Sequence, residues 1–276
     1  MRKLVRPSYC TNNRTKIPSL PYGNVSIWLA RVRKKMTEDE LSTLVLKHLG
    51  DRTTKPGAVL YSSVNSIQKA PFYLMGFNPG GTADHTDTSN TIGVNLCAPP
   101  GTNHYADQWW GEAGLEGATE PLSSEKRTPL QACVCNLFDM MKMSPRDVPS
   151  TNIIFARSNE ISGLQEKASW KALCWPVHKA MLSVVQPNLI ITLGIGATFS
   201  AVLAQGKAID RQEPVGDPDR PFAWARRMAL DFGDMQSEIT VLGVVHPSDR
   251  GSRGAKLRKI RRYPDEVGKF ISKFAD

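Results

Sequence analysis

The 276-residue sequence predicts an α/β fold, a three-layer α/β/α sandwich around a central four-stranded parallel sheet. Two observations carry this prediction. Four short apolar runs, typical of buried strands, alternate along the chain with longer segments of helical periodicity. The chain is also long enough, with 41% hydrophobic and 22% charged residues, to bury a full core without disulfides or metal ions.

The N-terminal segment is expected to be irregular, because three prolines interrupt its first 36 residues. A helix should follow, since Thr37 and Glu40 have the spacing of a capping box and apolar residues then recur at helical intervals. We divide the chain accordingly. Residues 1–68 form a basic arm plus this helix, packed on or extending the domain, and residues 69–276 form the main domain.

The rest of the chain alternates strands with helices. Because ligands of open parallel sheets bind outside the carboxyl ends of the strands, the residues directly after each strand are the expected place for chemistry. The predicted strands are residues 71–75, 152–156, 189–193 and 239–245, and the predicted helices between them are residues 130–141, 170–185 and 197–203.

Polar, turn-forming segments follow three of the four predicted strands. They are residues 76–81 (GFNPGG), 157–160 (RSNE) and 246–253 (HPSDRGSR). Each has an ordinary structural explanation, because Asn-Pro-Gly forms common turns and a single Asn or His after a strand usually caps backbone groups. Their arrival at three strand ends of one sheet nevertheless favours a shared site.

The net charge of +9 is concentrated at the two ends of the chain. Residues 1–37 carry nine basic and no acidic residues, and residues 249–276 carry nine basic and four acidic ones, whereas residues 38–248 have a net charge of −5. A polyanion partner is therefore expected at the termini only. A solvated basic face would have the same composition.

Several classes of protein do not fit the sequence. No apolar run approaches the roughly 18 to 20 residues of a membrane span, and residues 1–20 lack the apolar stretch of a secretory signal. The five cysteines are odd in number and scattered, as in proteins of a reducing compartment. Zinc-deaminase, phosphate-loop and nucleophile-elbow motifs are missing. We expect a cytoplasmic protein with no metal or nucleotide cofactor.

Two of the segments resemble the signature motifs of the uracil-DNA glycosylase superfamily. Residues 76–80 (GFNPG) and 246–248 (HPS) carry the resemblance, which is closest to the single-strand-selective and mismatch-specific branches. Residues 173–177 and 186–194 resemble the helix and third strand of that superfamily, so the similarity covers roughly residues 70–260. It implies a uracil-DNA glycosylase-like fold and a monofunctional glycosylase that flips a damaged or modified pyrimidine out of DNA and hydrolyses its N-glycosidic bond.

The resemblance also implies roles for individual residues. Asn78 would orient the attacking water, and His246 would hydrogen-bond the departing pyrimidine oxygen. Asn159 would read the Watson–Crick edge of the base, because an amide offers both a donor and an acceptor. The backbone around Gly76 and Phe77 would contact the base. An Asn at position 78, in place of the Asp of the best-known branch, removes a possible general base and implies a slower enzyme.

An aromatic platform for the flipped base is expected from Tyr105, Trp109 or Trp110, or from Phe77. The three former residues lie in a long polar insertion, residues 82–127, where members of the superfamily place base-pocket residues. Packing in a core or lid is the alternative role for the two tryptophans. Departures from the superfamily pattern in this insertion bear most directly on substrate choice.

The loop and helix after His246 would by resemblance bind DNA, the expected partner of a monomeric protein. The loop would enter the minor groove with Arg253 or Leu257 as a wedge, and basic residues would contact phosphates. A basic C-terminal helix turned to solvent is the alternative. The expected DNA-binding residues are Ser248, Arg250, Arg253, Lys256, Leu257 and Arg258.

Three hypotheses about function remain open at the level of sequence. The first is uracil-type base repair. The second is excision of a hypermodified cytosine, such as glucosylated hydroxymethylcytosine, from phage DNA as antiviral defence, motivated by the 82–127 insertion and the basic arm. The third is a non-catalytic DNA-binding module, against which the presence of both Asn78 and His246 argues. Cys174 matches the last cluster ligand of the iron–sulfur branch, but the other cysteines are missing and no cluster is expected.

Overall fold

A seven-stranded mixed sheet lies at the centre of the computed structural model, which describes residues 35–84, 86–108, 110, 123, 125–232 and 236–275. The described residues belong to one compact unit. Residues 1–34, and with them nearly all of the predicted basic arm, lie outside the described residues. Within the described ranges, no helix combines the length and apolar character needed to cross a bilayer.

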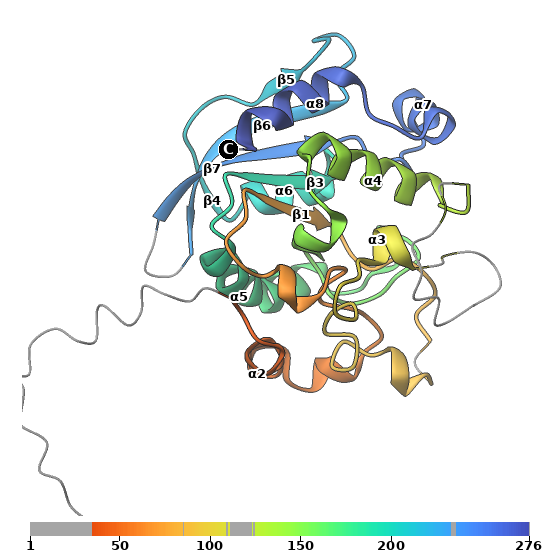
Figure 1. The fold of residues 1–276 in the computed structure, drawn as a ribbon. Helices are drawn as coiled ribbons and strands as arrows, with labels where there is room; N and C mark the ends of the chain where they lie inside the picture. Colours follow the sequence, from red (N-terminus) through yellow and green to blue (C-terminus); the bar gives the residue numbers. More distant parts are fainter. Residues whose placement is uncertain are drawn as a thin grey trace, which may run out of the picture. The chain divides into compact units, whose positions relative to one another are not determined.

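Four strands of this sheet run parallel and three run antiparallel to their neighbours (Figure 1). In order across the sheet, the parallel strands are β2 (Ser150–Asn152), β1 (Phe72–Gly76), β3 (Leu189–Leu193) and β7 (Gln236–Val244). On the far side of β7 follows β6 (Ala223–Asp231), with β4 (Gly206–Ala208) and β5 (Glu213–Val215) both paired to β6.

The sheet is therefore larger than the predicted four-stranded parallel sheet, and it is mixed. The antiparallel strands escaped prediction because their residues are only partly buried. Along β6, buried side chains alternate with more exposed ones, and β4 is mostly exposed. Such strands lack the continuous apolar run by which buried parallel strands were identified.

The second predicted strand, residues 152–156, is displaced toward the N-terminus. β2 ends at Asn152, and the apolar residues after it stay buried although they lie outside the strand. The Ile153 amide donates to the Gly76 carbonyl at 2.9 Å, and the Ile154 amide donates to the Phe77 carbonyl at 2.9 Å. The apolar run therefore indicates a buried segment that continues beyond the strand, and Asn152 lies at the carboxyl end of β2.

Helices cover both faces of the sheet (Figure 1). Within β1, Tyr73 and Met75 belong to one core cluster and Phe72 and Leu74 to the other, as the alternation of side chains along a strand requires. The first face packs against α5 (Lys167–Val185) and α6 (Ala197–Leu203), and α2 (Glu38–Leu49) packs against α5. The second face packs against α4 (Pro129–Met141), α7 (Ser252–Ile260) and α8 (Asp265–Ile271). A short helix, α3 (His104–Asp107), lies in the 82–127 insertion.

The capping box predicted before α2 is confirmed. The Thr37 hydroxyl accepts the Glu40 amide at 3.2 Å, and the Glu40 carboxylate accepts the Thr37 amide at 3.0 Å. The apolar face of α2 is buried in the same core as α5. No break in packing separates residues 35–68 from the rest of the compact unit, so this part of the predicted first segment is integral to the main domain.

Candidate active site

A cleft of about 1200 Å³ opens at the carboxyl ends of the parallel strands. Segments that follow β1, β3 and β7 line it together with the end of β2, which is where an open α/β sheet binds ligands. The cleft brings together nine of the site residues predicted from sequence: Gly76, Phe77, Asn78, Tyr105, Trp110, Asn159, His246, Ser248 and Arg250.

Asn78 is held in the loop after β1 by both hydrogens of its amide. Its Nδ2 donates to the Pro79 carbonyl at 2.8 Å and to the Ser158 carbonyl at 3.1 Å. Since a carboxamide has only two N–H donors, these bonds fix which way the group points. Its Oδ1 accepts no hydrogen bond from any described residue, so an acceptor with a fixed direction remains available in the cleft.

Asn152 lies on the cleft floor, beside Gly76 in the neighbouring strand. The Asn152 side chain occupies the space beside Gly76, so a Cβ on Gly76 would stand 2.2 Å from the Asn152 Oδ1, which explains the glycine. The Asn152 side chain is 2% exposed, and its Nδ2 makes no hydrogen bond of normal geometry with any described residue. Burial raises the pKa of the neighbouring Tyr61 hydroxyl, and the Asn152 side chain lies close enough to that hydroxyl to oppose the shift. A buried N–H without a partner is costly, so this donor is poised for a ligand acceptor.

His246 follows β7 and is held as a neutral ring. The Ser248 amide donates to its Nδ1 at 3.0 Å, and because an amide N–H can only donate, Nδ1 must be unprotonated. The ring proton therefore resides on Nε2. Burial lowers the pKa of His246 to about 4, against the opposing effect of the Asp249 carboxylate. At neutral pH the ring is an uncharged hydrogen-bond donor through Nε2.

Aromatic rings form one wall of the cleft. Tyr61 lies 5.0 Å from Tyr105 and 6.0 Å from Trp110, measured between ring centroids, and Tyr105 lies 5.4 Å from Trp110. All three rings line the cleft, as does Phe77. Of the rings predicted to form a platform, Phe77, Tyr105 and Trp110 thus lie at one wall of the cleft, whereas Trp109 lies outside the described residues. Tyr61 was not anticipated, because it precedes β1 in an irregular segment.

Arg157 is a second residue that the sequence analysis left without a role. Its guanidinium donates to the Gly80 carbonyl at 2.6 Å and to the Asn90 Oδ1 at 3.1 Å, so it joins the Asn78 loop to the insertion. It forms no ion pair within the described part of the chain. Burial, and then the charge of Arg157, lower the pKa of His104 to about 4. Arg157 therefore brings an uncompensated positive charge to the cleft.

Asn159 reaches the rim of the cleft and not its floor. Its side chain is exposed, and its Nδ2 donates to the Thr82 hydroxyl at a long 3.4 Å. Beside it, the Glu160 carboxylate pairs with Arg250 at 3.2 Å, an exposed ion pair that links this loop to the loop after His246. Pairs of this exposure contribute little to stability, so the link is easily opened by a ligand.

The predicted DNA-binding residues of α7 make different contacts in the structure. Lys256 is exposed and lies over the Phe222 ring, and Arg253 donates to the Pro221 carbonyl at 2.9 Å. Arg258 donates to the carbonyls of Pro247 and Asp249 at 2.8 and 2.7 Å, so its guanidinium braces the His246 loop.

Leu257 requires a correction, because its side chain is 0% exposed and packs in the core against α4. A side chain in that position is unable to enter a DNA groove, and the wedge prediction for Leu257 is wrong. The error arose because a basic helix in isolation gives no sign of which of its few apolar residues faces the core. Lone apolar residues in such a helix are better assigned to packing.

Metal-binding groups are not gathered in the described ranges: no cluster of three or more His, Cys, Asp or Glu side chains occurs there. Burial raises the pKa of Cys174 to about 12, so this thiol stays protonated at neutral pH and is a poor ligand in that form. Searches of protein-family models and of curated proteins find no match to this chain.

Proposed function

We propose that the protein is a monofunctional DNA glycosylase that accepts a flipped pyrimidine in the cleft and hydrolyses its N-glycosidic bond. One observation carries the proposal. A fixed amide acceptor on Asn78, a neutral Nε2 donor on His246 and an unpartnered donor on Asn152 share one cleft at the carboxyl edge of the sheet. These are the groups needed to place a water, to stabilise a leaving base and to recognise it.

Bond cleavage in this proposal depends on charge stabilisation more than on proton abstraction. The C1′–N bond of the nucleotide breaks, and its electron pair leaves with the base as an anion. The His246 Nε2–H donates a hydrogen bond to the base oxygen on which this charge collects. Water bonded to the Asn78 Oδ1 then adds to C1′, and its proton passes to solvent. Because an amide is not a general base, the bond between C1′ and the base must be largely broken before water attacks.

Base recognition is better explained by Asn152 than by Asn159. The Asn152 amide is buried on the floor of the cleft with a free donor, whereas the Asn159 amide is exposed at the rim. A flipped base is read where solvent does not compete for its hydrogen bonds. We therefore assign the reading of the Watson–Crick edge to Asn152 and leave Asn159 with a role at the entrance.

A hypermodified cytosine is the second candidate substrate, and the shape of the cleft favours it. A volume of about 1200 Å³ exceeds what an unmodified pyrimidine fills, since pockets for whole drug-sized ligands measure about 300 to 1000 Å³. The insertion adds polar groups to the lining, from Ser89, Asn90, Asn95 and Gln108. Side chains of this kind suit the hydroxyls of a sugar attached to the base.

The substrate is tested by incubating the protein with single strands and duplexes that carry uracil, hydroxymethylcytosine or glucosylated hydroxymethylcytosine. Alkali-labile abasic sites are then measured for each. The proposal expects release of at least one base, and it identifies the substrate by which one. If every strand stays intact under alkali while DNA is still bound, the protein is a non-catalytic binding module.

A further inference from the structure

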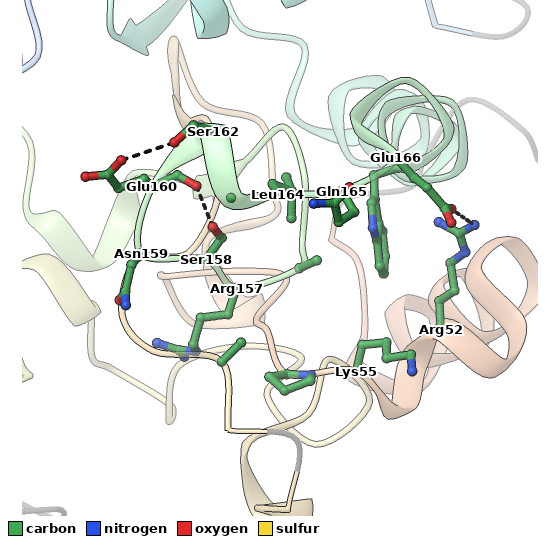
Figure 2. Close-up of a pocket in the computed structure, with 15 residues that line it drawn as sticks. Arg52, Lys55, Arg157, Ser158, Asn159, Glu160, Ser162, Leu164, Gln165 and Glu166 are labelled. Carbon is green, nitrogen blue, oxygen red and sulfur yellow. Dashed lines mark hydrogen bonds and ion pairs between the residues drawn. The ribbon is translucent and has the colours of Figure 1, made fainter.

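A second cavity, of about 750 Å³, is also lined by the loop that carries Asn159 (Figure 2). Its walls come from the segment after α2, from the 157–166 loop and from the start of α5. The cavity and the cleft share five lining residues: Arg157, Ser158, Asn159, Glu160 and Ser162. The cleft and the second cavity therefore adjoin along this loop.

Positive charge in this cavity is incompletely balanced. Figure 2 shows Arg52 directed at Glu166, to which it is bonded at 2.6 Å. The other carboxylate, on Glu160, is already engaged by Arg250 from outside the cavity, at 3.2 Å. The Lys55 ammonium has no hydrogen-bond or ion-pair partner among the described residues. Arg157 pairs with no carboxylate there, but its guanidinium is bonded to the Gly80 carbonyl and the Asn90 Oδ1 and is directed away from Lys55 (Figure 2). The Lys55 ammonium is thus left for an anionic ligand.

Other features of the cavity fit a nucleotide. The Arg157 Nε is buried and has no partner in the described ranges, so a further donor is unused near the shared wall. Pro56, Leu164 and Trp170 line the cavity but are themselves buried, and the Arg52 guanidinium stacks over the Trp170 ring at 4.8 Å. The Arg52 side chain is 30% exposed, so its guanidinium offers a flat surface beside a free cation. Proteins hold single-stranded nucleic acid with flat aromatic and guanidinium surfaces next to cations.

We infer that this cavity binds the nucleotide next to the one that enters the cleft, its phosphate on Lys55 and its base against the Arg52 guanidinium. The inference rests on the proposed function, since DNA must reach the cleft for its neighbour to reach the cavity. A free nucleotide or inorganic phosphate has the same chemistry, and the experiment separates these sources.

The test compares Lys55→Ala with Lys207→Ala, an exposed lysine of β4 that lines neither cavity. Dissociation constants are measured for unmodified single strands over a range of salt concentrations. Losing one phosphate contact should weaken binding of Lys55→Ala about fivefold near 0.1 M salt and reduce the salt slope by about 0.7, while Lys207→Ala binds as the native protein does.

Strand length provides the second arm. Removing the nucleotides on either the 5′ or the 3′ side of the central one should weaken binding by the native protein. For one of these two truncated strands, Lys55→Ala should cause no further loss of affinity, because the truncation and the substitution remove the same contact. Equal binding by Lys55→Ala and Lys207→Ala at every length would overturn the inference.

Deoxynucleoside monophosphate and inorganic phosphate are titrated separately. If Lys55→Ala abolishes their binding but leaves oligonucleotide binding unchanged, the cavity is a free-nucleotide site and the inference is wrong. Because the strands are unmodified, the outcome does not depend on base release. Base release without a Lys55 effect overturns this inference alone, and a Lys55 effect without base release overturns only the proposed function.

Discussion

At the scale of single residues, the site depends on hydrogen bonds that leave one atom of each key side chain available. Asn78 uses both N–H groups on backbone carbonyls and His246 uses Nδ1 on the Ser248 amide, so Oδ1 and Nε2–H remain for the reaction. The sequence motifs identified both residues. They did not identify Asn152, because the apolar run after it made the residue look like the first of a strand, although it is the last.

Replacing Asn78 by alanine tests its role directly. We expect Asn78→Ala to slow base release by a factor of about 100 to 1000, as expected for loss of a positioned polar group at the reacting centre, while affinity for DNA changes little. Single-turnover release and the dissociation constant are measured on the same strand. Equal losses in both would indicate that Asn78 only holds the loop together.

The assignment of base reading is tested by a matched pair of asparagines. Asn152→Ala should slow base release by about 100-fold, because it removes the buried donor, whereas Asn159→Ala should change it by less than about threefold. Thermal unfolding of both variants controls for folding. The reverse order of effects would restore Asn159 as the reading residue.

At the scale of elements, α7 serves the site as a brace as well as a candidate DNA surface. Arg258 bonds to two carbonyls of the His246 loop, and α7 packs so close to that loop that a Cβ on Gly254 would meet the Asp249 carbonyl oxygen. The basic composition of this helix indicated phosphate contacts for all its cations. Which cation faces backbone and which faces solvent depends on tertiary packing, and composition does not report it.

Arg258→Ala separates bracing from DNA binding. Loss of two charge-assisted hydrogen bonds should loosen the His246 loop and lower the rate of release about tenfold, with the salt slope of DNA binding unchanged. Lys259→Ala, on the same helix and exposed, should keep the native rate at saturating DNA. A reduced salt slope in Arg258→Ala with a native rate would instead make Arg258 a phosphate contact.

At the scale of the whole molecule, three strands and the helices between the predicted strands lie close to their predicted positions, whereas β2 is displaced and the antiparallel strands were not predicted. The predicted helices 130–141, 170–185 and 197–203 match α4, α5 and α6 closely, because each presents an apolar stripe to one face of the sheet. The strands β4, β5 and β6 are partly exposed and carry charged residues, so burial left too weak a signal in them.

Stability of the whole domain should fall with acid, and a buried histidine makes this measurable. Burial lowers the pKa of His178 to about 4. Below pH 6.5 His178 therefore binds a proton in the unfolded chain but not in the folded protein, and the free energy of unfolding falls until about pH 4. This linkage is worth up to about 3 kcal/mol.

His178→Gln keeps a donor for the Ile153 carbonyl, which His178 Nε2 contacts at 3.2 Å, and removes the titration. The melting temperature of this variant should vary less between pH 7 and pH 4.5 than that of the native protein. His104 and His246 keep part of the dependence, because burial lowers the pKa of each to about 4 as well. Parallel curves for the two proteins would show that His178 takes up its proton without unfolding.

The central claim is that water, and no group of the protein, replaces the base at C1′, and trapping with borohydride tests it most directly. The native protein is incubated with strands carrying each candidate base, with and without borohydride, and the products are weighed by mass spectrometry. We expect free base together with an uncleaved strand that has gained the elements of water at C1′, and no protein–DNA adduct. Strands bound but returned unchanged, or a base released with a covalent adduct or a cleaved strand, would contradict the account.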